Sequence, residues 1–191
     1  MSPVGERPGR GREIEDLIAS VVAREGTDAR AVGAALAGLG LHGIGIAEQV
    51  GGSGGDLAEL VAVLGALGLH GLSSPLLENA MAAWVLASAG CPMPETGMTL
   101  VLTDTAGSRD GLLLDDAPAV PWPVTEGAVV ICPADGPPLL LDLAQPGITV
   151  DPWLNLAGEP WARAVLSAPA AVQALPSAPP HAAIAARLGL L

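Results

Sequence analysis

The sequence contains no lysine, no phenylalanine and no tyrosine. Without lysine the chain cannot form a Walker-type phosphate loop, a Schiff base or a lysine general base, because each of them requires the ε-amino group. Four tryptophans are the only large aromatic side chains, so the core must be packed mainly from leucine, valine, alanine and isoleucine. Half of the 191 residues are apolar, which indicates a folded chain that is long enough to bury a core.

Positive charge is also scarce. The chain has 20 acidic residues against 8 arginines, and its formal net charge is −12. Such a chain repels phosphate backbones and anionic lipids, so we expect neither a nucleic acid nor a membrane as a partner. Residues 1–13 hold no signal-peptide core, and the longest apolar run, 80–93, is too short to span a bilayer. These observations predict a cytoplasmic protein in which the helix carrying residues 80–93 is buried.

Cysteine and histidine are too few for a disulfide framework or an evident metal site. Cys91 and Cys132 belong to no C-x-x-C motif and are interpreted as two buried thiols, although a single disulfide between them is possible. His42 and His70 occur in two copies of Leu-Gly-Leu-His-Gly, which we interpret as the glycine-rich ends of two helices. No carboxylate or cysteine shares their spacing, so we predict no metal site.

Helical periodicity covers most of the first half of the chain. Residues 13–24 place their apolar side chains on one helical face, with the spacing i, i+3, i+4, i+7, i+8. Asp28 is the expected cap of a second helix, and Asp56 with Glu59 forms a capping-box pattern for a third. A fourth helix is expected to begin at Ser74-Pro75 and to end at Gly90. We therefore predict a helical domain over residues 13–95, preceded by a disordered segment at 1–12.

The pattern changes near residue 97 to short apolar runs between proline, glycine and aspartate clusters. Strand-sized runs lie at 98–103, 128–132, 138–143, 148–150 and 162–166. They predict a small antiparallel β-barrel or β-sandwich domain over residues 96–170. The segment 168–180 is rich in alanine and proline and is interpreted as a linker or an extended edge, and residues 171–191 as linker plus the start of a helix at His181. The predicted fold class is α+β, with a C-terminal helical domain missing.

The glycine-rich stretch at 51–55 supports three hypotheses. Gly51-x-Ser53-x-Gly55 fits the nucleophile elbow of a serine hydrolase, which needs a strand before the serine and an acid and a histidine after it. Only one candidate strand precedes Ser53, at 43–50. A phosphate cradle is disfavoured, because Leu57 stands where the last glycine of G-x-G-x-x-G should be and Asp56 would repel an anion. The third hypothesis, a shaped loop in the wall of an acyl pocket, rests on a resemblance.

Residues 47–54, Ala-Glu-Gln-Val-Gly-Gly-Ser-Gly, resemble the P-E-x-x-G-G-x-G loop of the acyl-CoA dehydrogenase family, with alanine in place of proline. Residues 103–110 are similar to the family's T-E-P-x-A-G-S-D stretch, one residue shorter and with aspartate for glutamate. Trp122 resembles the tryptophan of the family's K-x-W-I-T/S stretch, although the lysine is absent. The order of helices followed by a β domain is also similar, over about residues 13–191. The resemblance covers roughly the first half of a usual family member.

The resemblance implies FAD-dependent α,β-desaturation of an acyl thioester carried by CoA or by acyl carrier protein. It implies flavin contacts from Thr103, Gly107, Ser108 and Trp122, and an acyl-binding role for Ser108, Gly51 and Gly52. The family's proton-abstracting glutamate lies in a C-terminal helical domain to which no residue here corresponds, so no catalytic base is assigned. We expect little dehydrogenation by the chain alone and expect a homo- or hetero-oligomer with a dehydrogenase subunit. The alternatives are a non-catalytic partner of a complete dehydrogenase and a hydrolase with Ser53 as its nucleophile.

Overall fold

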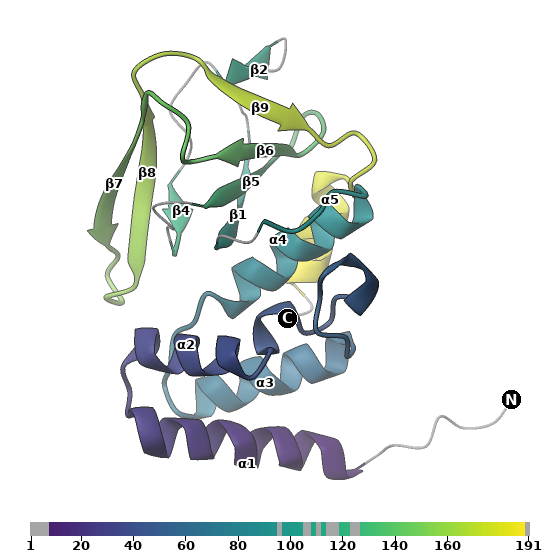
Figure 1. Cartoon of the computed structure of the whole chain (residues 1–191), viewed down its shortest axis with the longest axis vertical. Coiled ribbons are helices and arrows are strands. Elements are labelled where there is room, and N and C mark those ends of the chain that lie inside the picture. The colour runs from purple at the N-terminus through teal and green to yellow at the C-terminus, as the bar shows by residue number, and fades with distance from the viewer. Residues whose placement is uncertain are drawn as a thin grey trace, which may run out of the picture.

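The computed structural model describes residues 8–94, 97–104, 108–109, 112–113, 119–122 and 127–189. The helices of the first half occupy one end of the molecule and the strands the other, as Figure 1 shows. The α+β fold class predicted from the sequence is therefore confirmed. None of the helices within these described ranges combines the length and the apolar character needed to cross a bilayer.

The helices occur where periodicity predicted them. They are α1 (Pro8–Glu25), α2 (Ala29–Gly38), α3 (Leu57–Leu69), α4 (Leu76–Ser88) and α5 (His181–Leu188), with the short 3-10 helices η1 (Leu41–Gly43) and η2 (Glu48–Val50) between α2 and α3. Helix α1 begins at Pro8, earlier than the predicted boundary at residue 13. Proline is accepted there because its fixed φ suits the first helical turn and its missing N–H would have had no helical partner.

Side-chain caps explain where two of these helices begin. The Asp56 carboxylate accepts a hydrogen bond from the Glu59 backbone N–H at 3.0 Å, and the Glu59 carboxylate accepts one from the Asp56 N–H at 3.1 Å. This reciprocal pair is the predicted capping box of α3. Asp28 caps α2, since its carboxylate accepts a hydrogen bond from the Ala31 N–H at 3.1 Å. Both predicted caps are confirmed.

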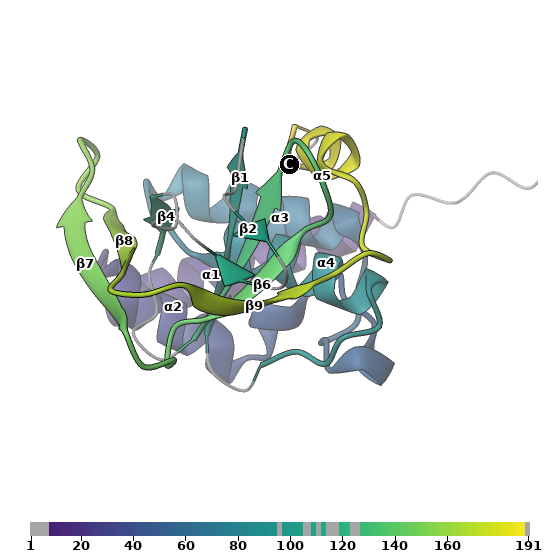
Figure 2. The same cartoon turned by 90° about the horizontal axis from the view of Figure 1, so that it is seen from above.

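The described strands form two sheets. The larger has the order β1–β5–β6–β9–β3–β2 and the smaller the order β4–β8–β7. The strands of the larger sheet are β1 (Met98–Thr103), β5 (Ala128–Pro133), β6 (Leu139–Asp142), β9 (Ala170–Ala174), β3 (Leu112–Leu113) and β2 (Ser108–Arg109). Those of the smaller sheet are β4 (Val120–Pro121), β8 (Pro160–Leu166) and β7 (Ile148–Leu154). Seen from above in Figure 2, the β7–β8 hairpin stands at one side of the molecule, away from α5.

The sheets differ from the predicted antiparallel barrel in two respects. Strands β1 and β5 pair in parallel, from Met98 opposite Ala128 to Thr103 opposite Pro133. The intervening chain passes through β2, β3 and β4 before it returns, so β5 runs in the same direction as β1. Within the described residues the sheets stay open and close no barrel. They are joined at β1 and β4, where the fully buried Thr99 hydroxyl donates a hydrogen bond to the Pro121 carbonyl at 2.7 Å.

Strand β9 corrects the prediction of a linker after residue 168. It lies inside the larger sheet, paired with β6 on one side and with β3 on the other. Ala170 and Val172 are buried and alternate with exposed residues, which is the period of a half-buried strand. Because alanine has a low preference for strands, the segment carries a weak local signal and gains its structure from its neighbours in the sheet.

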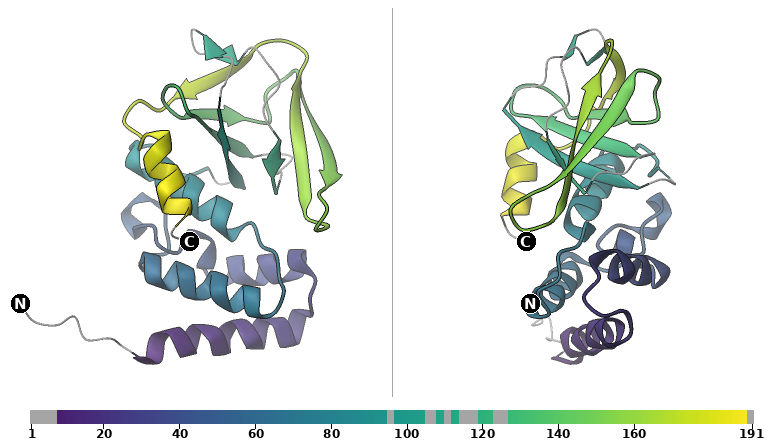
Figure 3. Two further views of the ribbon diagram at one scale, coloured as in Figure 1. Left: turned by 180° about the vertical axis from the view of Figure 1, so that it is seen from behind. Right: turned by 90° about the vertical axis from the view of Figure 1, so that its left-hand side faces the viewer.

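Helix α4 belongs to two cores at once. Its residues Leu76 and Ala80 pack in the helical core with Ile18, Leu36, Leu60 and Val63. Its residues Met81, Val85 and Leu86 pack in a second core with Leu100 of β1, Val130 of β5 and Ile184 of α5. The two views in Figure 3 both show α5 beside α4. The predicted burial of this helix is therefore confirmed, and the reason is that it separates helices from sheet.

The two thiols differ in accessibility. Cys132 lies on β5, is fully buried, and burial raises its pKa to about 12. Cys91 follows α4, is half-buried and accepts a hydrogen bond from the Gln173 side chain at 3.5 Å. Both cysteines are free. The prediction of buried thiols is thus confirmed for Cys132 and only partly for Cys91.

We therefore expect one thiol of the native protein to react quickly and the other to be protected from reaction. With a thiol-reactive disulfide reagent at pH 8, Cys91 should react first and Cys132 only after denaturant is added, because the thiolate is the reactive form. The Cys91→Ser variant should lose the fast reaction and keep the reaction of Cys132 that requires denaturant. Equal reaction rates for both thiols in the folded state would contradict the burial of β5.

Candidate functional site

A cleft lies where the α3–α4 connection and α4 face strands β1, β4 and β8. It consists of two adjoining pockets of about 400 and 300 Å³, which share Glu78, Pro121 and Trp161. We call them together the interdomain cleft. Its larger part has a mostly apolar wall that includes Leu100, Leu102, Ala119 and Leu188. An apolar concave site with a few polar groups is the usual form of a small-molecule site.

Trp122 lies in the smaller part of the cleft in an unusual backbone conformation. Its φ is 49°, a left-handed value that is rare for a bulky residue. The conformation is held by a hydrogen bond of 2.8 Å from the Trp122 N–H to the Pro160 carbonyl. Thr99 fixes the preceding residue, Pro121, from the other side. Backbone strain that the surroundings enforce is concentrated at functional sites in proteins, and Trp122 has this property.

Two buried polar atoms of the cleft have no hydrogen-bond partner within the described part of the chain. They are Oε2 of Glu78 and the indole Nε1 of Trp161. Burial raises the pKa of the Glu78 carboxyl; the nearby charge of Glu159 adds to the rise, and a hydrogen bond from the Glu78 backbone opposes it. The Glu78 carboxyl is thus shifted toward its neutral form.

Glu159 has the opposite electrostatic setting. Hydrogen bonds from the Ser73 hydroxyl and from Asn155 lower its pKa, so it is held in the charged form. The Asn155 side-chain amide donates to the Glu159 carboxylate at 2.8 Å, and Oδ1 of Asn155 accepts from the N–H groups of Ala157 and Glu159, both at 2.9 Å. Because Ser73 belongs to the α3–α4 connection, these contacts fasten the turn of the β7–β8 hairpin to the helices and bound one end of the cleft.

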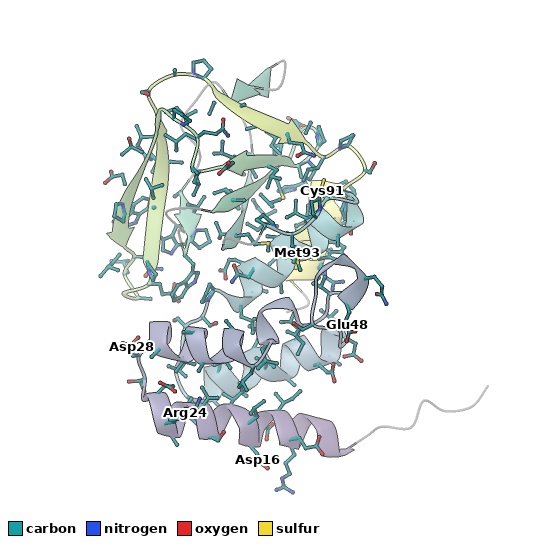
Figure 4. All side chains as sticks on the ribbon, in the orientation of Figure 1. Asp16, Arg24, Asp28, Glu48, Cys91 and Met93 are labelled. Carbon is teal, nitrogen blue, oxygen red and sulfur yellow. The ribbon has the colours of Figure 1, made fainter. Side chains whose placement is uncertain are left out.

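The glycine-rich loop lies at the other end of α3. Its residues precede α3, whereas the cleft is formed by the last turns of α3, the α3–α4 connection and later elements. A Cβ on Gly52 would collide with the Ile46 carbonyl, and a Cβ on Gly51 would lie 3.0 Å from Cε of Met93. Figure 4 labels Met93 and Glu48, which indicate where this loop lies. The structure therefore separates Gly51 and Gly52 from Trp122, and their tight contacts account for the glycines. The acyl-binding role of these two glycines stays a prediction.

The segment before Ser53 does not form the strand that a nucleophile elbow requires. Ile44 and Ile46 make only isolated bridges to Gly54, and η1 and η2 occupy the rest of the segment. Ser53 is exposed and borders a separate hollow of about 350 Å³ between the loop and α1. The strand expected at 43–50 is absent from the described structure, because its glycines turn the backbone at Gly45 and Gly51, where φ is positive. The geometry gives the hydrolase hypothesis no support.

The other predicted flavin contacts are only partly assembled. Thr103 ends β1 directly after Leu102, a cleft residue, and its carbonyl accepts a hydrogen bond from the Ala134 N–H at 2.8 Å. Gly107 lies outside the described residues. Ser108 begins β2, at the opposite edge of the sheet from β1, and its side chain also lies outside them. Thr103 and Trp122 thus lie at or beside the cleft, and these contacts stay predictions.

Three cleft residues were missed by the sequence reasoning: Glu78, Glu159 and Trp161. A signal for Glu78 exists, since it is the one charged residue in the mostly apolar stretch 76–88. A carboxylate there must either be neutral or have a partner. Glu159 and Trp161 carry no comparable local signal, because only the fold brings the β7–β8 hairpin to the helices.

The cleft can be compared with what FAD requires. Its apolar wall, Trp122 and the unpaired indole N–H of Trp161 suit an aromatic ring system. The described residues lining it include no cationic side chain, whereas a diphosphate is normally held by such side chains or by a helix N-terminus. These residues therefore do not fit a complete FAD. The described chain also gathers no group of three His, Cys, Asp or Glu side chains that could hold a metal ion.

One family model matches the helical part of the chain. The family model described as acyl-CoA dehydrogenase, N-terminal domain, matches residues 11–92. This match contains most of α1 and the whole of α2, the glycine-rich loop, α3 and α4. The resemblance expected from residues 47–54 is therefore confirmed. No curated protein matches the sequence.

Solved structures with the same fold include proteins of this family. The Tcur3481–Tcur3483 steroid ACAD has a TM-score of 0.65 and 22% sequence identity, and the match covers 95% of this chain and 61% of that chain. The ChsE4–ChsE5 complex of Mycobacterium tuberculosis has a TM-score of 0.66 and 17% identity, covering 99% and 61%. This chain thus spans 61% of the length of each.

A nitrososynthase from Micromonospora carbonacea var. africana is also similar. Its TM-score is 0.59 and its identity 18%, and the match covers 88% of this chain and 54% of that chain. At such identities the three structures show the fold alone. Since the same architecture occurs in proteins of different chemistry, function has to be argued from the site.

The contact of Gly52 with Ile46 can be tested by substitution. Gly52→Ala should lower the free energy of unfolding by about 1–3 kcal/mol, because the new methyl group would strike a backbone carbonyl that cannot move away freely. Gly65→Ala is the matched control, since Gly65 lies in α3 with open space around its Cα. That variant should gain about 0.5–1 kcal/mol from helix propensity. Urea denaturation of both variants would measure the difference, and a Gly52→Ala variant as stable as the parent would contradict the described loop.

The two cleft carboxyls should affect stability in opposite directions as pH changes. The folded pKa of Glu78 is raised, so its contribution to stability is fully present below the unfolded pKa and is lost as pH rises through the folded pKa. Glu78→Gln should therefore match the parent near pH 4 and be more stable at pH 7. The folded pKa of Glu159 is lowered, so its contribution is present above the unfolded pKa and is lost as pH falls. Glu159→Gln should be less stable at pH 7, with a difference that shrinks toward acid.

Thermal melts of these variants between pH 4 and pH 8 would provide the comparison. A Glu78→Gln variant that is less stable than the parent at pH 7 would show that the carboxylate is paired and charged, against its buried and unpaired setting in the cleft.

Proposed function

We propose that the chain is a member of the acyl-CoA dehydrogenase family, whose N-terminal domain model matches residues 11–92, and that it supplies an acyl-thioester-binding part of a dehydrogenase. The reaction proposed for the assembled enzyme is FAD-dependent α,β-desaturation of an acyl thioester. The acyl group would lie in the interdomain cleft. The activity requires groups that the described residues do not provide.

The observation that carries this proposal is the interdomain cleft itself. It lies between the helices of the matched family segment and the sheet that comes after them, and its larger part is walled by aliphatic side chains. Burial of an acyl chain against such a wall gains about 0.8 kcal/mol per methylene group. The hydrogen bonds from Ser73 and Asn155 to Glu159 hold the hairpin over one end, so the cleft is formed before a ligand enters.

The cleft offers no suitable base among its described residues. Abstraction of an α-proton needs a carboxylate that is charged at working pH and within hydrogen-bond reach of that proton. Burial shifts Glu78 toward its neutral form, and the hydrogen bonds of Ser73 and Asn155 already occupy Glu159. The absence of cationic side chains from the same lining leaves the FAD diphosphate without a partner. We therefore assign the base and much of the cofactor site to parts of the assembled enzyme outside the described residues.

A heteromeric enzyme is consistent with one of the similar structures. ChsE4–ChsE5 was solved as a complex of two named subunits. By analogy, this chain would act as the acyl-binding member of such a pair. A purely structural partner subunit that never touches the substrate is the second candidate, and it is favoured only by the incomplete FAD site.

Binding of an acyl thioester by the purified chain separates these candidates. Titration with octanoyl-CoA in a calorimeter should show saturable binding. Ala119→Trp should weaken that binding about tenfold or more, because the larger side chain fills the cleft. Ala58→Trp, on the exposed face of α3, is the matched control and should bind as the parent does. No binding, or equal weakening by both substitutions, would favour the structural partner.

The same preparation should be colourless and inactive. We expect no flavin absorption bands after purification and no turnover of octanoyl-CoA with an artificial electron acceptor. Addition of a cognate dehydrogenase subunit should restore both properties. Turnover by these 191 residues alone would contradict the assignment of the base to a part of the enzyme outside the described residues.

A further inference from the structure

The two unpaired polar atoms belong to side chains from different parts of the fold that line the same cleft. Glu78 lies in the first turn of α4, and Trp161 is the second residue of β8. Both residues line both pockets of the interdomain cleft. Oε2 of Glu78 and Nε1 of Trp161 are inaccessible to solvent and have no hydrogen-bond partner among the described residues. An acceptor and a donor without partners thus belong to two side chains that line one cleft, whose larger part is otherwise apolar.

Leaving such groups unpaired is costly. A buried polar atom without a partner costs about 1–3 kcal/mol, and nearly all buried polar atoms in proteins are paired for this reason. The other polar groups at this end of the cleft are already engaged. Glu159 accepts from Ser73 and Asn155, and the Ser74 hydroxyl accepts from the Leu76 N–H at 3.2 Å. A ligand group that pairs with both free atoms therefore gains more than apolar contact alone would give.

We propose that Glu78 and Trp161 form a hydroxyl-binding pair, so that the cleft selects an apolar group that carries one hydroxyl. The hydroxyl oxygen accepts a hydrogen bond from the Trp161 indole N–H, and the hydroxyl proton is donated to Oε2 of Glu78. This inference rests on the proposed function for one point only, namely that the apolar group is the acyl part of a thioester. The preferred substrate class is then a hydroxylated acyl thioester.

Other ligand groups satisfy the pair less well. A carboxylate or phosphate would be repelled by Glu159 and by any charge on Glu78. An ammonium group could bind Glu78 but would face the positive end of the indole N–H dipole. A ketone accepts from Trp161 but has no proton for a charged Glu78. A hydroxyl both donates and accepts, so it satisfies both partners whether the Glu78 carboxyl is neutral or charged.

The experiment uses small probes that do not depend on thioester binding. Cyclohexanol and methylcyclohexane have similar size and differ in the hydroxyl. Their binding to the full chain is measured from the four indole N–H resonances in ¹⁵N-edited spectra, and Trp161→Phe assigns the Trp161 signal. We expect cyclohexanol to bind about tenfold more tightly, the size of effect that pairing a buried polar site produces. It should also shift the Trp161 indole resonance, which methylcyclohexane should leave in place.

Variants test the pair itself. Glu78→Leu and Trp161→Phe should each abolish the preference for cyclohexanol, while Glu78→Gln, which keeps a donor and an acceptor, should retain most of it. Trp84→Phe is the matched control, because Trp84 lies on α4 under the Arg187 guanidinium, 4.5 Å from the ring centroid, and lines neither pocket. If Glu78→Leu does not fold, Trp161→Phe alone decides.

The outcomes separate this inference from the proposed function. Equal affinity for both probes, no binding of either, or a preference that survives Glu78→Leu and Trp161→Phe would overturn the hydroxyl-binding pair. A hydroxyl preference that depends on both residues would support it even if octanoyl-CoA fails to bind, and only the proposed function would then fall. Tighter binding of 8-hydroxyoctanoyl-CoA than of nonanoyl-CoA, lost in the same variants, would support both.

Discussion

Burial of α4 on two opposite sides is the constraint on which the rest of the structure depends. Leu76 and Ala80 complete the helical core, while Met81, Val85 and Leu86 complete the core beneath the larger sheet. The buried residues of α4 that serve both cores are leucine, alanine, valine and methionine. The double burial also fixes the first turn of α4 at the boundary between helices and sheet. The interdomain cleft is therefore a consequence of how the two cores share one helix.

Two carboxyl groups with opposite pKa shifts, those of Glu78 and Glu159, line the cleft. Hydrogen bonds keep Glu159 charged at the hairpin turn, and desolvation favours the neutral form of Glu78 at the helix. The charged group has a structural role, since it ties the hairpin to the α3–α4 connection. The other carboxyl belongs to a residue that lines the cleft together with Trp161. One acid thus maintains the shape of the site, and the second is the one to which we assign ligand recognition.

Local signals predicted the helices and the longer strands, but strand pairing and site geometry lay beyond them. Asp28 and Asp56 cap their helices by accepting hydrogen bonds from residues three positions later, so these helix starts can be predicted from the sequence. The parallel pairing of β1 and β5 and the strand character of β9 depend on distant partners. At the site, the glycine-rich loop gave the family resemblance, whereas the cleft polar pair arises from α4 and β8, far apart in sequence.

The parallel pairing of β1 with β5 has a consequence for biosynthesis. As the polypeptide leaves the ribosome, α4 and β1 emerge well before the strand that covers them, because the β2–β4 excursion is translated in between. During that interval the sheet-facing side of α4 has no complete cover, and such transient apolar surfaces attract chaperones or aggregate. The nascent chain is therefore most vulnerable between the translation of β1 and that of β5, and slow codons in this window would extend its exposure.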